Sequence, residues 1–242
     1  MVIKMVCFLT SSPVIPGTEL LNPANAFTDE LRRCFCRGCR TVFICSDPDL
    51  YDETDFFANA TKEIFENAGF SFGSFCILDS RNEHEAPELV KRSDLIILAG
   101  GHVPTQNRFF NRIGLRGLLK DYTGILIGIS AGSMNSAEIV YAQPEREGEA
   151  VDPAYQRFLT GLGLTRTNLL PHYQENRDAV LDGLRIYEDI ACSDSMGRTF
   201  YAIPDGSYLL IDDGKEELRG EAYRIKDGAL SRISSRGDVL PL

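Results

Sequence analysis

The serine best placed for chemistry lies among small residues, in the segment Gly128-Ile129-Ser130-Ala131-Gly132. An apolar run, residues 124–129, precedes the serine, and a segment with helical character follows it. Small residues on both sides of a serine permit a sharp turn from a strand to a helix, which exposes the hydroxyl group at the end of a sheet. In such a turn the backbone N–H of Ala131 points at the oxygen that becomes negative when a carbonyl group is attacked. The segment therefore predicts Ser130 as a nucleophile, unless its glycines serve close packing alone.

A serine hydroxyl group is a poor nucleophile without a base, and the chain has three histidines. His172 follows a proline at the end of an apolar run, 42 positions after Ser130, and is the best candidate for the base. His84 lies in a charged run and is expected to be solvated. His102 follows two glycines at the end of another apolar run, where it could line a pocket and bind substrate, or simply cap a loop. A histidine without a catalytic role remains the alternative for His172, because chain order does not show that two side chains meet.

A third group should hold the imidazole of His172 in the correct tautomer. The polar stretch 143–152 is expected to be a surface loop near Ser130, and it offers four acids: Glu145, Glu147, Glu149 and Asp152. Most acids in such a run are simply solvated. Residue types alone therefore do not choose among the four.

A pair of glycines, Gly100-Gly101, follows the apolar run Leu95 to Ala99. Open α/β sheets bind their ligands at the carboxyl ends of such strands. Because glycine has no Cβ, a backbone N–H there can approach a reacting carbonyl group closely. Gly101 is therefore a candidate for the second donor of an oxyanion hole, beside Ala131. A tight turn into a helix that begins near Thr105 explains the same glycines equally well.

Alternating strand and helix signals indicate the fold that would hold these residues. Apolar, β-branched runs predict strands at 3–9, 41–45, 72–78, 95–99 and 124–129, and helix signals lie between them, for example at 52–69. Such alternation requires crossover connections and hence a parallel sheet. Runs at 200–203, 208–211, 221–226 and 229–233, separated by turn residues, predict antiparallel strands. We expect a single doubly wound α/β domain, residues 1–242, with a small antiparallel addition at its carboxyl end.

Length, composition and charge restrict the class of protein. With 242 residues and 43% hydrophobic composition the chain can bury one sizeable core, and no apolar run is long enough to span a membrane. The seven cysteines, an odd number in a chain of this size, favour a reducing compartment, so a cytoplasmic location is expected. The net charge of −10 argues against a nucleic-acid or anionic-membrane partner.

Three cysteines, Cys34, Cys36 and Cys39, lie close enough in sequence to suggest a metal site. A second pair of ligands at suitable spacing is missing from the sequence around them. We therefore expect small buried hydrophobic residues here, and no metal. No organic cofactor is implied either.

Four segments in order resemble the dipeptidase E (aspartyl dipeptidase) family of serine peptidases, which is related to the cyanophycinases and has a fold similar to class I glutamine amidotransferases. The segments are Ala99-Gly100-Gly101, the serine segment 128–132, Val151-Asp152-Pro153 followed by Pro171-His172-Tyr173, and Ile203-Pro204-Asp205-Gly206. A glutamine amidotransferase itself would need cysteine in place of Ser130.

The resemblance implies a Ser-His-acid triad in which Ser130 and His172 match the nucleophile and the base. The family acid lies five positions before the Val-Asp-Pro segment, which implies Glu147. The oxyanion donors would be the N–H groups of Gly101 and Ala131.

Dipeptidase E cleaves dipeptides with an amino-terminal aspartate, partly through an arginine that follows the histidine. Arg177 would supply that guanidinium group here, since it can pair with a carboxylate through two hydrogen bonds. A solvated charge on a helix running to Tyr187 is the alternative for Arg177.

We therefore predict a serine peptidase that hydrolyses small peptides, with a small peptide substrate as its partner. The resemblance implies a preference for an amino-terminal aspartate. Two alternatives stay open. An esterase of the α/β-hydrolase type would share the order of serine, acid and histidine. A binding protein without catalytic activity could use the same fold.

Overall fold

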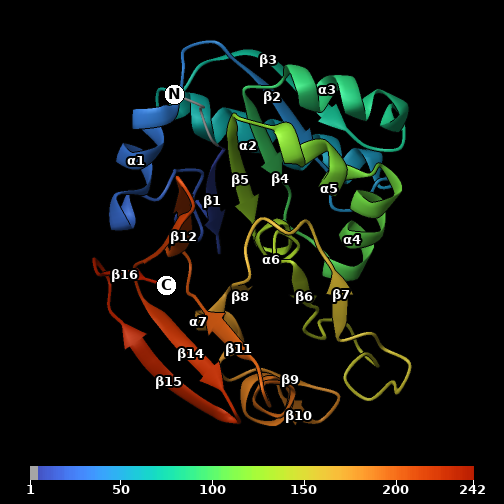
Figure 1. Cartoon of the computed structure of the whole chain (residues 1–242), viewed down its shortest axis with the longest axis vertical. Coiled ribbons are helices and arrows are strands. Elements are labelled where there is room, and N and C mark those ends of the chain that lie inside the picture. The colour runs from blue at the N-terminus through green and yellow to red at the C-terminus, as the bar shows by residue number, and fades with distance from the viewer. Residues whose placement is uncertain (1–4) are drawn as a thin grey trace.

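The computed structural model describes residues 5–242, which build an eight-stranded central sheet (Figure 1). Across the sheet the strands are β16 (Val239–Pro241), β13 (Lys215–Arg219), β12 (Tyr208–Asp212), β1 (Val6–Thr10), β5 (Ile125–Ile129), β4 (Leu95–Leu98), β2 (Cys39–Ile44) and β3 (Phe72–Leu78). Strands β1, β5, β4, β2 and β3 are parallel, whereas β12, β13 and β16 extend the sheet in antiparallel pairs. The predicted mostly parallel α/β fold is confirmed. Ile3 and Lys4 of the first predicted strand lie outside the described residues.

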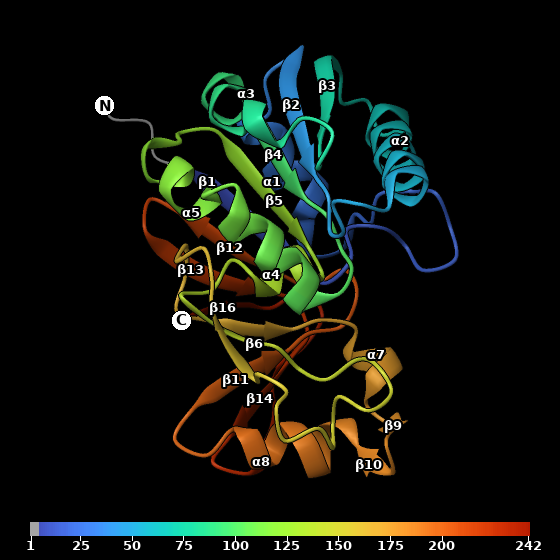
Figure 2. The same ribbon diagram turned by 90° about the vertical axis from the view of Figure 1, so that its right-hand side faces the viewer.

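Helices cover both faces of the parallel strands, because these strands bury side chains on both sides. On one face α1 and α2 pack against Phe8 and Phe43, and on the other α3, α4 and α5 pack against Leu9 and Ile44. Figure 2 shows α2 on one side of the strands and α3, α4 and α5 on the other. The helices are α1 (Phe27–Cys34), α2 (Tyr51–Asn67), α3 (Ala86–Arg92), α4 (Val103–Arg112) and α5 (Leu115–Leu118), with 3-10 turns at Ala24–Ala26, Glu83–Glu85 and Leu119–Asp121.

The carboxyl-terminal strands are divided between two sheets. Strands β12 and β13 join the central sheet, whereas β11 (Thr199–Ala202), β14 (Ala222–Lys226) and β15 (Ala229–Ser234) form a second sheet with β8 (Asn168–Leu170). This second sheet lies below the central sheet in Figures 1 and 2. Within it β8 and β11 are parallel neighbours, with Leu170 opposite Ala202. Because parallel strands end at the same edge, the residues that follow β8 and β11 lie next to each other.

Two predicted helical segments are shorter than the sequence indicates. After Ser130 the helix α6 spans only Ala131–Met134, and the apolar residues beyond it belong to strand β6 (Ile139–Tyr141), which pairs with β7 (Phe158–Thr160). After His172 the helix α7 spans only Tyr173–Asn176, so Arg177 does not lie on a long helix. A hairpin of β9 (Val180–Leu181) and β10 (Leu184–Arg185), a π-helical turn at Ile186–Ala191 and α8 (Cys192–Asp194) follow. In the described part of the chain, no helix combines the length and the apolar character needed to cross a membrane.

Candidate active site

Ser130 lies in a strained turn between β5 and α6. Its backbone has φ 49° and ψ −110°, a conformation that non-glycine residues rarely adopt. The Ser130 N–H donates to the carbonyl oxygens of Ser11 (3.0 Å) and Thr10 (3.1 Å), which follow and end the neighbouring strand β1. These hydrogen bonds hold the turn in place against the strain. The strand, turn and helix around the serine agree with the predicted nucleophile segment.

The two glycines of the segment are required by close packing. A Cβ on Gly128 would lie 2.9 Å from the Cα of Ser133, and a Cβ on Gly132 would lie 2.5 Å from the carbonyl oxygen of Leu98. Both contacts are closer than real Cβ atoms tolerate. The packing of α6 onto β4 and β5 thus depends on glycine at both positions. Close packing and a serine side chain that lines a cavity are consequences of the same turn.

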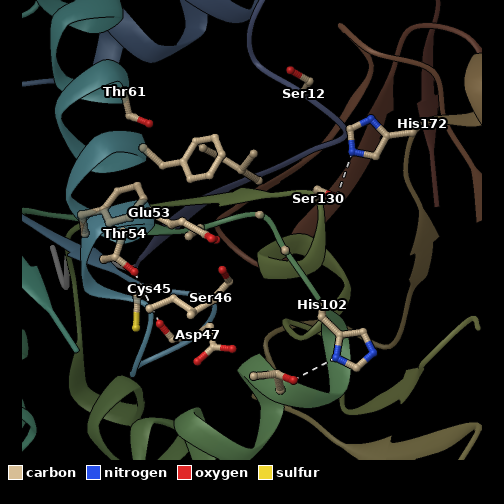
Figure 3. A pocket seen from close by; sticks show the side chains of 18 of the residues that line it. Ser12, Cys45, Ser46, Asp47, Glu53, Thr54, Thr61, His102, Ser130 and His172 are labelled. Carbon is tan, nitrogen blue, oxygen red and sulfur yellow. Dashed lines mark hydrogen bonds between the residues drawn. The ribbon is translucent and has the colours of Figure 1, made fainter. Parts of the chain in front are cut away.

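His172 lies within hydrogen-bonding distance of Ser130, with 2.9 Å between its Nε2 and the serine Oγ (Figure 3). Its Nδ1 lies 2.9 Å from Oδ1 of Asp205. Ser11 holds His172 and Asp205 in position, because its hydroxyl group donates a hydrogen bond to Asp205 (2.6 Å) and accepts one from the backbone N–H of His172 (2.8 Å). Serine, imidazole and carboxylate therefore form one continuous row of hydrogen bonds, the arrangement of a Ser-His-acid triad.

The fold brings these groups together from three strands. Ser130 follows β5 of the central sheet, whereas His172 and Asp205 follow β8 and β11, the parallel neighbours of the second sheet. His172 itself has a left-handed backbone (φ 58°), which turns its ring toward the serine. The site therefore lies where the carboxyl end of β5 meets the carboxyl ends of β8 and β11.

The charges around the row favour an ionised carboxylate and a basic imidazole. Burial alone would lower the pKa of His172, but its hydrogen bond to Asp205 and the nearby charges of Asp205, Glu175 and Glu145 outweigh burial and raise the pKa. Burial alone would raise the pKa of Asp205, but the hydrogen bonds from His172 and Ser11 lower it below its usual value. Asp205 thus remains a carboxylate that stabilises a positive charge on His172.

The structure corrects the predicted acid. Glu147 is exposed in the loop between β6 and β7 and makes no hydrogen bond within residues 5–242, so it does not orient His172. Asp205 takes that place, because the parallel pairing of β8 with β11 puts it beside the histidine. Of the other candidate acids, Glu149 binds His102, and Asp152 accepts the N–H of Ala154.

Two backbone N–H groups beside Ser130 have no hydrogen-bond partner among residues 5–242, those of Gly101 and Ala131. Gly101 has φ 148°, and a Cβ there would lie 2.4 Å from the Oγ of Ser46. Only glycine fits this position, so the N–H remains accessible from the cavity. Gly101 and Ala131 thus provide the two free N–H groups that the expected oxyanion hole needs. Their contact with a reacting oxygen stays a prediction.

Two cavities meet at Ser130, Gly101 and His172. The larger has a volume of about 450 Å³ and extends between β2 and α2 to Asp47, Glu53 and Phe57. The smaller has about 220 Å³ and is bounded by polar side chains, namely Gln143, Glu145, Glu175 and Asn176. Part of Glu145 stays exposed, yet burial of its carboxyl group and, second, the charge of Glu149 raise its pKa to about 7. A substrate bound at Ser130 can therefore extend in two directions.

The two predicted substrate-binding residues differ from expectation. His102 lines the larger cavity, but its Nδ1 binds the Thr105 hydroxyl group (2.8 Å) and its Nε2 binds Glu149 (2.9 Å), which leaves no ring nitrogen for a substrate. Arg177 is exposed, pairs with the adjacent Asp178 (2.9 Å) and lines neither cavity. The guanidinium group that does line the larger cavity belongs to Arg146. The loop 143–152 folds back over the site and brings Arg146 to the cavity. Sequence order alone could not predict this position of Arg146.

Among residues 5–242 one group of side chains has the spacing of metal ligands, His172, Glu175 and Asp205, whose ligand atoms lie within 4.8 Å of one another. His172 and Asp205 already bind each other, and His172 also binds Ser130. Their chemistry is therefore explained by the row of hydrogen bonds.

A family model decides the class of protein. The model of peptidase family S51 matches residues 7–219. The chain belongs to peptidase family S51. This is the dipeptidase E family that the four sequence segments resemble, and membership makes the chain a peptidase. Of the three functional hypotheses, the family favours the peptidase over the esterase and the binding protein.

Solved structures agree on the fold. A peptidase from an acI-B1 Actinobacterium is similar over 99% of this chain and 97% of its own, with a TM-score of 0.69 and 17% sequence identity. A proposed peptidase E from Listeria monocytogenes EGD-e is similar over 95% of this chain and 99% of its own, with a TM-score of 0.56 and 20% identity. No curated protein matches the sequence. The S51 peptidase therefore shares its overall fold with proteins of very different sequence.

Proposed function

We propose that this chain is a serine peptidase that hydrolyses small peptides through Ser130, His172 and Asp205. The observation that carries the proposal is the row of hydrogen bonds from Ser130 through His172 to Asp205, with 2.9 Å in each step. The N–H groups of Gly101 and Ala131 beside the serine, which have no partner within residues 5–242, support it further.

The reaction would begin with proton transfer from Ser130 to Nε2 of His172 as the serine Oγ attacks the peptide carbonyl carbon. The N–H groups of Gly101 and Ala131 stabilise the negative oxygen of the tetrahedral intermediate. His172 then gives its proton to the leaving amine, and the peptide bond breaks to leave an acyl-enzyme. Water, deprotonated by His172, releases the acyl group and restores the serine. Asp205 stays ionised throughout and holds the imidazolium in position.

The two cavities suit a short substrate, with one cavity on each side of the scissile bond. The smaller cavity carries the carboxyl groups of Glu145 and Glu175, which suit the free ammonium group of a peptide. A preference for an amino-terminal aspartate would need a cation for its side chain. Arg177 does not reach either cavity, so the structure offers no support for the predicted role of that residue.

Hydrolysis of a dipeptide and tripeptide library by the wild type and by Ser130→Ala tests the proposal. We expect the wild type to release free amino acids and Ser130→Ala to lose at least a thousandfold in kcat/KM. Ser74→Ala, on the exposed part of β3, serves as a matched control and should retain full activity. Undiminished hydrolysis by Ser130→Ala would contradict the proposal.

A further inference from the structure

The far wall of the larger cavity carries two carboxylates that face the Ser130–His172 pair across the cavity. Asp47 lies beyond the end of β2, and Glu53 lies in the first turn of α2. Figure 3 shows both on the side of the cavity opposite His172. A substrate residue that fills the cavity from Ser130 would therefore end near these two acids.

Neither carboxylate has a cationic partner within residues 5–242. Asp47 accepts the backbone N–H of Asp49 (3.2 Å), and Glu53 makes no ion pair or hydrogen bond. By contrast Asp55, on the same helix as Glu53, pairs with Arg81 outside the cavity. The chain thus neutralises a neighbouring acid but leaves the two acids of the cavity available.

The rest of this wall is apolar. Phe57 and Leu50, 60% and 46% exposed, line the cavity from α2 and the residue before it, and the buried Phe43 lines it from β2. Long cationic side chains lay their methylene groups on such surfaces and keep the charged end at a polar rim. An aromatic face such as that of Phe57 also attracts a cation.

We propose that the larger cavity selects peptides with a lysine or arginine side chain, whose cation is bound by Asp47 and Glu53. The inference rests on the proposed peptidase function. Arg146 also lines this cavity, so an acidic side chain would meet one guanidinium group and two carboxylates. The balance favours a positive side chain, and the net charge of −10 attracts cationic peptides in the same sense.

A set of peptides that carry lysine, norleucine or aspartate at one position and are otherwise identical tests this selectivity. Their hydrolysis is measured with the wild type, and their binding is measured with Ser130→Ala. We expect lysine to exceed norleucine about five- to tenfold in both measurements, and aspartate to be the weakest. In Asp47→Asn/Glu53→Gln the ratio of lysine to norleucine peptides, in hydrolysis and in binding, should fall to about one. Equal binding of lysine and norleucine peptides would overturn the inference, as would an aspartate preference that Arg146→Ala abolishes. Because binding is measured without the serine, a failure of hydrolysis alone would count against the proposed function only.

A separate observation concerns two thiols at the opposite end of β2. The Sγ atoms of Cys36 and Cys39 lie 2.9 Å apart, and Cys39 also donates to the carbonyl oxygen of Cys36 (2.9 Å). Cys36 is exposed, whereas Cys39 is fully buried at the start of β2. Cys34, by comparison, donates to the helix carbonyl of Leu31 (3.3 Å). One accessible thiol thus lies in contact with one protected thiol.

We infer that Cys36 and Cys39 form a reversible disulfide with each other when a low-mass disulfide such as oxidised glutathione oxidises them. The thiolate of Cys36 attacks one glutathione sulfur and releases one reduced glutathione, which gives a mixed disulfide. Cys39 then attacks the Cys36 sulfur, its proton passes to the departing glutathione thiolate, and a second reduced glutathione leaves. The two protein thiols lose two electrons and two protons, which the oxidised glutathione gains. The expected small buried hydrophobic residue describes Cys39 but not the exposed Cys36.

Mass spectrometry of the full chain after incubation with oxidised glutathione tests this inference. We expect a loss of about 2 Da, a Cys36–Cys39 link in the peptide map and full reversal by dithiothreitol. Cys34→Ser should behave like the wild type, whereas Cys39→Ser should stop at the mixed disulfide on Cys36. Two alkylatable thiols at Cys36 and Cys39 after prolonged incubation, or a link from either to Cys34, would overturn the inference.

Discussion

At the scale of single residues, Asp205 shows what the acid of this site must do. It accepts hydrogen bonds from the imidazole of His172 and from the hydroxyl group of Ser11, and its side chain is almost fully buried. A buried carboxylate is costly unless such donors surround it. Asp205 is therefore held in one orientation and fixes the ring of His172, which no exposed acid on a loop could do as firmly.

We expect Asp205→Asn to lower kcat by roughly two to four orders of magnitude with little change in KM, because the amide cannot stabilise the imidazolium. Glu147→Gln, which removes the acid that the sequence implies, should keep nearly full activity. Steady-state kinetics on one peptide substrate compare the two variants. Loss of activity in Glu147→Gln, with Asp205→Asn unaffected, would restore the predicted acid.

The raised pKa of His172 sets the pH dependence of the reaction. A protonated imidazole cannot take the serine proton, so kcat/KM should fall as the pH decreases through the pKa of His172, which lies above the usual value of about 6.5. In Asp205→Asn the carboxylate that raises this pKa is gone, and the residual activity should lose its acidic limb at a lower pH. A pH profile of kcat/KM for both proteins measures the difference. An acidic limb at the same pH in both would contradict this electrostatic account.

At the scale of elements, the turn between β5 and α6 depends on the absence of two Cβ atoms. We expect Gly132→Ala to reduce the free energy of unfolding by about 1–3 kcal/mol, because its Cβ would press on the Leu98 carbonyl oxygen 2.5 Å away. Gly117→Ala in α5 is the control, since nothing lies within 4 Å of a Cβ at that position. Urea denaturation compares the two variants. Equal stability of Gly132→Ala and the wild type would show that α6 can shift without cost.

The loop between β6 and β7 is held over the site by Glu149. Its carboxylate binds Nε2 of His102 (2.9 Å) and the backbone N–H groups of Glu145 (2.9 Å) and Arg146 (3.0 Å). Glu145 and Arg146 line one cavity each, so Glu149 acts as a positioning residue for both.

We expect Glu149→Ala to raise KM about tenfold for small peptides, to leave the acidic limb of the pH profile in place, and to speed proteolysis within 144–152. Kinetics and limited trypsin digestion measure these effects. A fall in kcat at constant KM, with the loop still protected, would argue against this role.

At the scale of the whole molecule, the site forms where two sheets meet. The central sheet and Ser130 follow from local patterns, since apolar runs and the small residues of 128–132 are visible in the sequence. The position of Asp205 is not visible in that way. Residues 203–206 have the composition of a turn, and only the parallel pairing of β8 with β11, more than 30 residues apart, shows that they end beside His172. Long-range pairing of this kind leaves no periodic pattern in the sequence.

The residues that line the cavities are likewise not predictable from local sequence patterns. Sequence patterns place Arg177 near the histidine along the chain, yet α7 ends at Asn176 and directs the arginine into solvent. Arg146 lies in the loop between β6 and β7, whereas Asp47 and Glu53 lie around the start of α2, and only the assembled fold brings these two segments to one cavity. Ser130 and His172 can therefore be recognised from motifs, whereas Asp205 and the residues that line the cavities depend on tertiary structure.

The rate at which a fluorophosphonate probe labels the protein, with the adduct located by tandem mass spectrometry, tests whether Ser130 is a nucleophile activated by His172 and Asp205. We expect a single adduct on Ser130, labelling that slows at least a hundredfold in His172→Ala and Asp205→Asn, and an unchanged rate in Glu147→Gln. An adduct on another residue, or a Ser130 that reacts equally fast without His172 and Asp205, would contradict this role of Ser130.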